Sequence, residues 1–185
     1  MPKGLALRHG FAASEGKYVA FTDADLPYGL EIINKMYRTM EGNRTVALLF
    51  GSRSHSLSKS SSYGWLRSAG RNFFSNVVKN LVISDVKDTQ CGVKMLRADL
   101  AHRTAVSAMA NRFAFDIEIF AIARQNQLQY QDFPVTLSHR KESSVRLIKD
   151  TLLMLYDIVK IRLRMQQHFY AQTSSVDPES IRTIK

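Results

Sequence analysis

The stretch KYVAFTDADLPY, residues 17–28, decides the fold of this 185-residue chain. Lys17 to Thr22 is rich in aromatic and β-branched residues, which predicts a short strand ending at Asp23-Ala24-Asp25. A helix is expected from about Gly29 to Met40, and the apolar run Val46 to Phe50 predicts a strand buried on both faces. A strand, a helix and a strand at this spacing predict a parallel α/β unit whose strands bring their polar ends to one edge.

The rest of the chain alternates between helical and extended patterns. Helices are expected over Gly4–Ser14, Trp65–Leu81, Asp99–Met109, Ala114–Arg124 and from Ser143 or Ser144 to about Tyr170, and strands over Val93–Leu96 and Leu128–Val135. The serine-rich stretch Ser54–Gly64 is typical of a loop. We expect one domain over residues 1–170 and a polar tail over 171–185.

Composition narrows the class of protein. The chain has 26 Lys and Arg against 16 Asp and Glu, a formal charge of +10, and 45% apolar residues. This charge favours nucleic acid, anionic lipid or phosphorylated small molecules as ligands. Its single cysteine, Cys91, excludes an internal disulfide framework and a CxxC metal site. No apolar run approaches the ~18 residues of a membrane-spanning helix.

The pair Asp23 and Asp25 is the strongest local signal for chemistry. The two carboxylates follow a buried strand, and ligands of open α/β sheets bind beyond the carboxyl ends of the strands. Carboxylate oxygens suit Mg²⁺ or Mn²⁺ bridging a diphosphate. A turn or capping role for either aspartate is the alternative.

Two further motifs carry acidic residues. DTQCGVKML, residues 88–96, joins Asp88 to Lys94, and its plainer interpretation is an Asx-turn followed by a surface lysine. RFAFDIEI, residues 112–119, places Asp116 and Glu118 in a first helical turn, where the helix dipole favours carboxylates in any case. Because positions i and i+2 do not share a helix face, at most one of the two should point at a given site.

The order of these motifs matters more than any one of them. KGLALRHG, GKYVAFTDADLPY, GSR, R-x-x-x-R, DTQCG-x-K and FAFD-x-E in succession closely resemble family 2 glycosyltransferases. Within them the chain is most similar to the polyprenyl-phosphate branch and its dolichyl-phosphate β-glucosyltransferase group, from Lys3 to about Arg164. The resemblance implies a GT-A, Rossmann-like α/β fold with a mostly parallel sheet flanked by helices. It implies an Mg²⁺- or Mn²⁺-dependent, inverting transfer of a hexose, glucose from UDP-glucose, to dolichyl or undecaprenyl phosphate.

The resemblance also implies roles for individual residues. Donor-binding residues would be Lys3, Asp23, Asp25 and Arg53, with the two aspartates as metal ligands; catalytic carboxylates would be Asp88, Asp116 and Glu118. The acceptor phosphate is already an anion, so the reaction needs cations more than it needs a strong base. The candidates on the acceptor side are Arg67, Arg71, Lys94 and Arg140, although Arg67 and Arg71 also fit a solvated helix face.

Several alternatives stay open at this point. The last helix is apolar at helical spacing with basic neighbours, which fits core packing or peripheral contact with the cytoplasmic face of a membrane. The first strands of the family, with its base- and ribose-binding motif, have no counterpart here, so we expect a truncated domain with weak or no turnover. Val93 stands where the group usually has an aromatic residue. The alternatives are a mannosyl or aminosugar transferase, an inactive fragment, or a basic nucleic-acid-binding module.

Overall fold

The computed structural model describes residues 1–53, 76–86, 88–136 and 147–171. Its elements, in chain order, are α1 (Lys3–Ala12), β1 (Tyr18–Thr22), α2 (Glu31–Gly42), β2 (Val46–Ser52), β3 (Val93–Arg97), α4 (Ala98–Ser107), α5 (Phe115–Gln125), β4 (Gln129–Pro134) and α6 (Leu147–Gln166). Residues 76–81 are also helical. The serine-rich stretch, the start of the helix expected from Trp65 and the expected cap of α6 lie outside the described residues.

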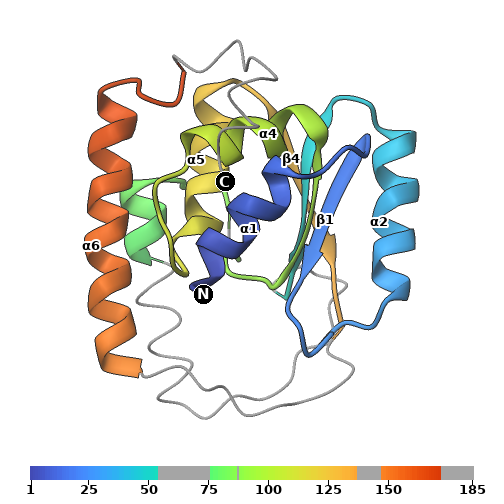
Figure 1. Cartoon of the computed structure of the whole chain (residues 1–185), viewed down its shortest axis with the longest axis horizontal. Helices are drawn as coiled ribbons and strands as arrows, with labels where there is room; N and C mark the ends of the chain where they lie inside the picture. The colour runs from blue at the N-terminus through green and yellow to red at the C-terminus, as the bar shows by residue number, and fades with distance from the viewer. Residues whose placement is uncertain (54–75, 87, 137–146, 172–185) are drawn as a thin grey trace.

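The four strands form one mixed sheet in the order β1-β3-β2-β4 (Figure 1). β3 pairs antiparallel with both β1 and β2, and β4 pairs parallel with β2. β1, β2 and β4 therefore run in the same direction, as the strand–helix–strand spacing predicts. The spacing does not predict that β3, which comes later in the chain, lies between β1 and β2, because a crossover fixes direction but leaves room for an inserted strand.

Helices cover both faces of the sheet. Figure 1 shows α2 against one face, α1, α4 and α5 against the other, and α6 outside α5. The expected strand at 46–50 is confirmed: every residue of β2 is buried, and its burial extends to Ser52. A register shift between Val46 and Leu48 places Ala47 and Leu48 in the same core, on the α5 side.

The sheet has a hydrophobic core on each face, one on the α2 side and one on the α5 side, and these explain where Lys94 lies. Val93 and Met95 of β3 pack in the α2 core, whereas Leu96 packs in the α5 core. Because side chains alternate along a strand, Lys94 also lies on the α5 side, and its ammonium group is 5.4 Å from the centre of the Phe21 ring. The fold thus buries a lysine beneath α5.

α5 is the central helix of this face. Phe115 to Ala123 are all buried, and two of them, Asp116 and Glu118, are acidic. Such residues are almost never buried without partners.

Within the described residues, no helix is both long and apolar enough to cross a bilayer.

Candidate functional site

The carboxyl end of β1 brings Asp23 to the edge of the sheet beside the start of β3. The backbone amide of Asp23 donates a hydrogen bond to the carbonyl oxygen of Gly92 at 2.9 Å. A Cβ atom at position 92 would overlap the Asp23 carboxylate, so only glycine lets the carboxylate lie against this backbone. Gly92 therefore helps to place Asp23.

A tight turn follows Asp23 and presents Asp25 to solvent. The amide of Leu26 donates to the carbonyl of Asp23 at 2.9 Å, and Leu26 has a φ of 46°, a conformation rare for a residue that is not glycine. The side chain of Asp25 is exposed and has no hydrogen-bond or ion-pair partner among the described residues. The turn thus supplies one carboxylate that is free to bind a ligand.

Lys3 connects the Asp23 carboxylate to α5. Its Nζ atom lies 3.2 Å from Oδ1 of Asp23 and 2.9 Å from Oδ2 of Asp116. Nζ of Lys94 lies 2.6 Å from Oδ1 of Asp116 and also donates to the Cys91 carbonyl at 2.9 Å. The four side chains form a row of alternating charge that runs from the fully buried Lys94 to the half-exposed Asp23.

The position of Lys3 depends on close packing of the first turn of α1. A Cβ atom on Gly4 would come within 2.6 Å of the Ala110 carbonyl oxygen and 2.8 Å of Cβ of Phe115. The amide of Leu5 donates to the Asn111 carbonyl at 3.2 Å. Glycine thus lets α1 begin against the start of α5, within reach of Asp116.

A second ion pair lies at the end of β2. Oδ2 of Asp88 accepts hydrogen bonds from the backbone amide of Arg53 at 3.0 Å and from its Nε at 2.8 Å, and Oδ1 accepts from Nη2 at 2.8 Å. Such a bidentate ion pair fixes the plane of the guanidinium group. Arg53 keeps 27% of its side chain exposed, whereas Asp88 keeps 8%. The aspartate is buried and the arginine faces out.

Burial and neighbouring charges shift the pKa values of Lys3, Asp88 and Asp116 in opposite directions. Burial alone would raise the pKa of Asp116, but the Lys94 and Lys3 ammonium groups outweigh it and hold that pKa below its usual range. Burial likewise opposes ionisation of Asp88, and Arg53 lowers its pKa nonetheless. Burial would lower the pKa of Lys3, which Asp116 and Asp23 raise instead. All three groups are therefore charged at neutral pH.

Glu118 points elsewhere, as the helix geometry predicts. It is fully buried; Oε2 accepts hydrogen bonds from the amides of Met109 and Ala110 at 2.9 and 2.7 Å. Oε1 accepts from the Tyr170 hydroxyl at 2.6 Å and from Nη1 of Arg164 at 3.2 Å. Glu118 thus ties the loop before α5 to the end of α6.

Cys91 and Tyr28 close the α2 side of the site. The Cys91 thiol donates to the Tyr28 hydroxyl at 3.3 Å, and both residues are buried. Burial raises the pKa of the Cys91 thiol and of the Tyr28 hydroxyl. Both stay neutral, so this pair adds no charge beside Arg53 and Asp88.

The residues at the sheet edge suit a hard divalent cation in part. Asp25 and Asp23 are adjacent oxygen donors, and Mg²⁺ or Mn²⁺ is commonly held by one or two carboxylates while phosphates and water supply the other ligands. Among the described residues there is no group of three or more His, Cys, Asp or Glu side chains arranged to hold a metal.

The structure brings most of the sequence-predicted residues to one edge and separates others. Lys3, Asp23, Asp116 and Lys94 form the charged row, Arg53 pairs with Asp88, and Asp25 lies in the adjoining turn. Glu118 lies on the far side of α5, and Arg67, Arg71 and Arg140 lie outside the described residues. The roles of Gly92 and Gly4 were not predicted from the sequence. The available signal was that Gly4 directly follows Lys3 and that Gly92 lies in the motif of Asp88 and Lys94.

Comparisons with known proteins give similar sequences over most of the chain. It is 31% identical over 170 residues to the dolichyl-phosphate β-glucosyltransferase of Mus musculus, covering 88% of this chain and 52% of that protein. It is 29% identical over 166 residues to the Dictyostelium discoideum protein of the same name, covering 88% of this chain and 51% of that protein. The chain thus spans about half the length of these relatives. No family model matches the sequence.

A solved structure shares the fold. Glucosyl-3-phosphoglycerate synthase from Mycobacterium tuberculosis, crystallised with Mn²⁺, UDP-glucose and phosphoglyceric acid, superposes with a TM-score of 0.59. The match covers 89% of this chain and 55% of that one at 18% sequence identity. At this identity the likeness concerns the fold alone.

Proposed function

Because this chain is a distant homologue of the dolichyl-phosphate β-glucosyltransferases and has the GT-A glycosyltransferase fold, we propose that it binds the diphosphate of a nucleotide sugar and transfers the hexose to a polyprenyl phosphate. The donor proposed is UDP-glucose, since the relatives are named as glucosyltransferases and the structural neighbour was crystallised with UDP-glucose. The acceptor proposed follows from the dolichyl phosphate in the relatives' name.

The observation that carries the proposal is the charged row at the carboxyl end of β1. Asp23 is oriented by Lys3 on one side and by the Gly92 backbone on the other, and Asp25 stands free beside it. A preorganised set of charges at this edge of an α/β sheet suits a phosphorylated ligand. Lys3, with a quarter of its side chain exposed, would add positive charge near the donor diphosphate.

We propose that a divalent cation binds through Asp25 and Asp23. When bound, Mg²⁺ or Mn²⁺ supplies positive charge that stabilises the departing nucleoside diphosphate. The protein's part is to hold the two carboxylates at the rim of the sheet, where the Asp23 amide is fixed to Gly92. The turn at Leu26 keeps the Asp25 carboxylate in solvent.

The three carboxylates offered as catalytic have different proposed roles. A general base works best when its pKa lies near the working pH, and the pKa values of Asp88 and Asp116 are held low. Asp88 would orient Arg53 toward a phosphate, and Asp116 would hold Lys3 in place. Glu118, which is fully buried with both oxygens engaged, would stabilise the fold around them.

The acceptor phosphate needs cations more than a base, since it is already ionised near neutral pH. Arg53 is the described arginine that faces outward at this edge. Lys94 is fully buried between Asp116 and the Cys91 carbonyl, so we propose it as the counter-ion of Asp116 rather than a phosphate ligand. Arg67, Arg71 and Arg140 remain proposals for the acceptor side.

Calorimetric titration with UDP-glucose, with and without Mn²⁺, tests the proposal. We expect Mn²⁺-dependent binding to weaken by about ten-fold or more in Asp25→Asn, which removes a charged ligand and keeps the size of the side chain. The matched control is Asp99→Asn, an exposed aspartate in the first turn of α4.

Equal Mn²⁺-dependent affinity in the unaltered chain and in Asp25→Asn would contradict the metal assignment. A folded sample that binds no UDP-glucose under either condition would contradict the proposal that this chain holds a donor site by itself. An assay with radiolabelled UDP-glucose and dolichyl phosphate then tests the transfer, and UDP-N-acetylglucosamine and GDP-mannose test the alternative sugars.

A further inference from the structure

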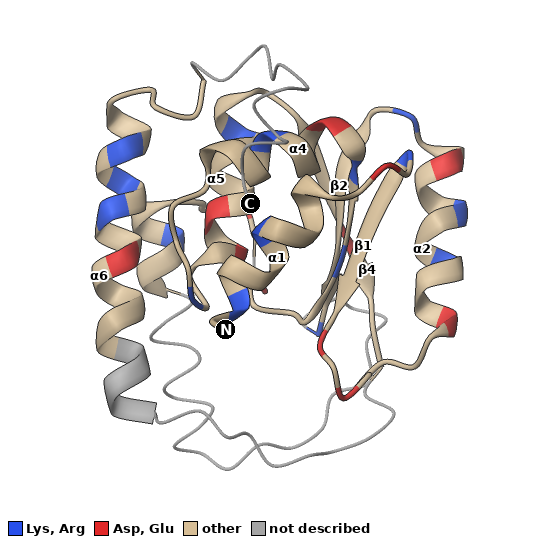
Figure 2. Cartoon of the chain, in the orientation of Figure 1, with Lys and Arg blue, Asp and Glu red and all other residues tan. Residues whose placement is uncertain are grey.

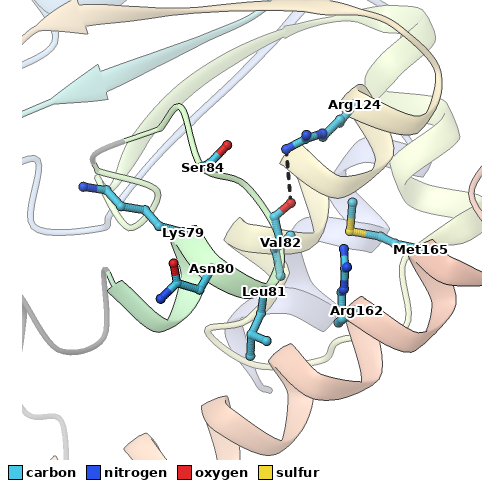
Figure 3. A pocket seen from close by; sticks show the side chains of 8 residues that line it. All are labelled: Lys79, Asn80, Leu81, Val82, Ser84, Arg124, Arg162 and Met165. Atoms are coloured by element: carbon cyan, nitrogen blue, oxygen red, sulfur yellow. Dashed lines mark hydrogen bonds between the residues drawn. The ribbon is translucent and has the colours of Figure 1, made fainter.

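A cavity of about 220 Å³ lies away from the charged row, between the helical residues 76–81, the end of α5 and the second half of α6 (Figure 3). Three of its lining residues are basic and come from three different segments: Lys79, Arg124 and Arg162. Asn80 and Ser84 add polar groups, and Leu81 and Met165 add apolar surface. No carboxylate lines the cavity, so its described walls are positively charged.

One of the arginines is held in position by the protein. Nη1 of Arg124 donates to the carbonyl oxygen of Val82 at 3.4 Å, the contact drawn in Figure 3. Arg162 is exposed and has no ion-pair partner among the described residues. Arginine guanidinium groups with amide and hydroxyl donors nearby match the oxygens of a phosphate group. We propose that this cavity binds the phosphate group of a small anion or of a lipid headgroup.

The cavity differs from the proposed donor site in both its size and its position. A volume of about 220 Å³ is below the roughly 300–1,000 Å³ of pockets that hold drug-sized ligands, so it suits a phosphate better than a nucleotide sugar. Asp116 lies in the first turn of α5 and Arg124 in its last turn, which separates them by about 12 Å along the helix axis. The cavity is thus a second site on the same helix.

The surface of α6 supplies a reason to test lipid as one source of the phosphate. Its outward face carries an apolar row at helical spacing, formed by four residues that are about half exposed or more: Leu152, Tyr156, Val159 and Leu163. Figure 2 shows basic residues gathered on the second half of α6, the half that lines the cavity through Arg162 and Met165. A helix that carries both exposed apolar side chains and basic residues suits the surface of an anionic bilayer.

The experiment measures two kinds of binding in four proteins. Arg162→Ala and Arg124→Gln remove cavity cations, and Arg38→Ala removes an exposed arginine from α2 on the opposite face of the sheet. Inorganic phosphate is titrated into each protein in the calorimeter. Sedimentation is then measured with vesicles of phosphatidylcholine alone and with phosphatidylglycerol added, and circular dichroism confirms that each variant is folded.

We expect either inorganic phosphate or phosphatidylglycerol vesicles to bind the unaltered chain, and about ten-fold weaker binding in both cavity variants. Arg38→Ala should bind like the unaltered chain. Loss with inorganic phosphate indicates a free anion as the source, and loss with phosphatidylglycerol vesicles alone indicates a lipid headgroup. Equal weakening in all three variants would overturn the proposal, because the effect would then follow net charge rather than the cavity. No binding of either probe to the unaltered chain would overturn it too, because the cavity would then hold no phosphate.

Discussion

Asp116 is a buried charge of the candidate site, and two ammonium groups balance it. Lys94 has no exposed surface, and Asp116 keeps 1%. Removing one partner of a buried ion pair leaves the other charge undercompensated, and without Lys94 the buried Asp116 keeps only the partly exposed Lys3. We expect Lys94→Met to lower the free energy of unfolding by about 3–5 kcal/mol, measured by urea denaturation.

The same reasoning supplies the control for Lys94. In Lys94→Met/Asp116→Asn the buried carboxylate charge is gone as well, so part of the lost stability should return. Lys17→Met breaks an exposed pair with Glu41 and should leave the urea midpoint nearly unchanged. If Lys94→Met unfolds at the same urea concentration as Lys17→Met, the buried pair does not stabilise the fold.

Gly92 tests how closely the Asp23 carboxylate must be placed. In Gly92→Ala the new methyl group would overlap that carboxylate and force it to move. Because the Asp23 carboxylate is a proposed metal ligand, we expect Mn²⁺-dependent UDP-glucose binding to weaken by about ten-fold or more, while the far-ultraviolet circular dichroism is kept.

Gly10→Ala is the matched substitution for Gly92→Ala. Nothing lies within 4 Å of a Cβ atom at position 10, and the residue is inside α1. Alanine favours a helix over glycine by roughly 1 kcal/mol, so this variant should melt at a higher temperature and bind UDP-glucose normally. Normal binding by Gly92→Ala would show that Asp23 does not need its present position.

These residues also show what the sequence can predict at this scale. That Asp116 and Glu118 face different ways follows from helix geometry alone, and the structure confirms it. That Arg53 meets Asp88 does not follow, because the two are distant in the chain and meet through the pairing of β2 with β3. Local patterns carry no information about such a pairing.

At the scale of elements, α5 links the candidate site to the end of α6. Its Asp116 joins the charged row, and its Glu118 accepts the Tyr170 hydroxyl. Gln125 of α5 strengthens the link by donating to the Met165 carbonyl at 2.6 Å and accepting from the Tyr170 amide at 3.1 Å. The polar contacts of α6 with α5 thus converge on its last turn and on Tyr170 beyond it.

Tyr170→Phe removes one donor from a fully buried carboxylate. We expect it to lower the free energy of unfolding by roughly 1–3 kcal/mol, the usual cost of an unsatisfied buried group. Tyr156→Phe removes a hydroxyl from the exposed face of α6 and should change stability little. UDP-glucose affinity of folded Tyr170→Phe should match that of the unaltered chain; a specific loss of affinity would instead place Glu118 in the binding machinery.

The elements themselves were largely predictable, for a physical reason. A continuous apolar run such as Val46 to Phe50 has no polar side for solvent, which predicts a strand buried on both faces, and the structure confirms that strand. The position of β3 between β1 and β2 was not predictable, because it depends on side-chain packing across the sheet. Arg67, Arg71 and Arg140 lie in segments 54–75 and 137–146, outside the described residues, so their roles on the acceptor side stay predictions.

At the scale of the whole molecule, two buried carboxylates with lowered pKa values make the stability of the fold sensitive to acid. The pKa values of Asp88 and Asp116 are lowered in the folded chain, so both stabilise it above the ordinary aspartate range of about 4. As the pH falls through that range and toward their lower folded values, protonation is favoured in the unfolded chain and this stability is lost. The 26 Lys and Arg then repel one another as the 16 acidic residues become neutral.

Urea denaturation at a series of pH values from 7 to about 3 measures this loss. We expect the urea midpoint to be nearly constant near neutral pH and to fall steeply below about pH 4. Asp88→Asn should be less stable at pH 7, because Arg53 loses its charged partner, and should lose less on acidification, because one group with a lowered pKa is gone. Asp99→Asn, which removes an exposed carboxylate, should keep the steep fall. If Asp88→Asn loses as much stability between pH 7 and 3 as the unaltered chain, then Arg53 does not hold Asp88 ionised. In that case Arg53 lacks the fixed partner on which its proposed contact with phosphate depends.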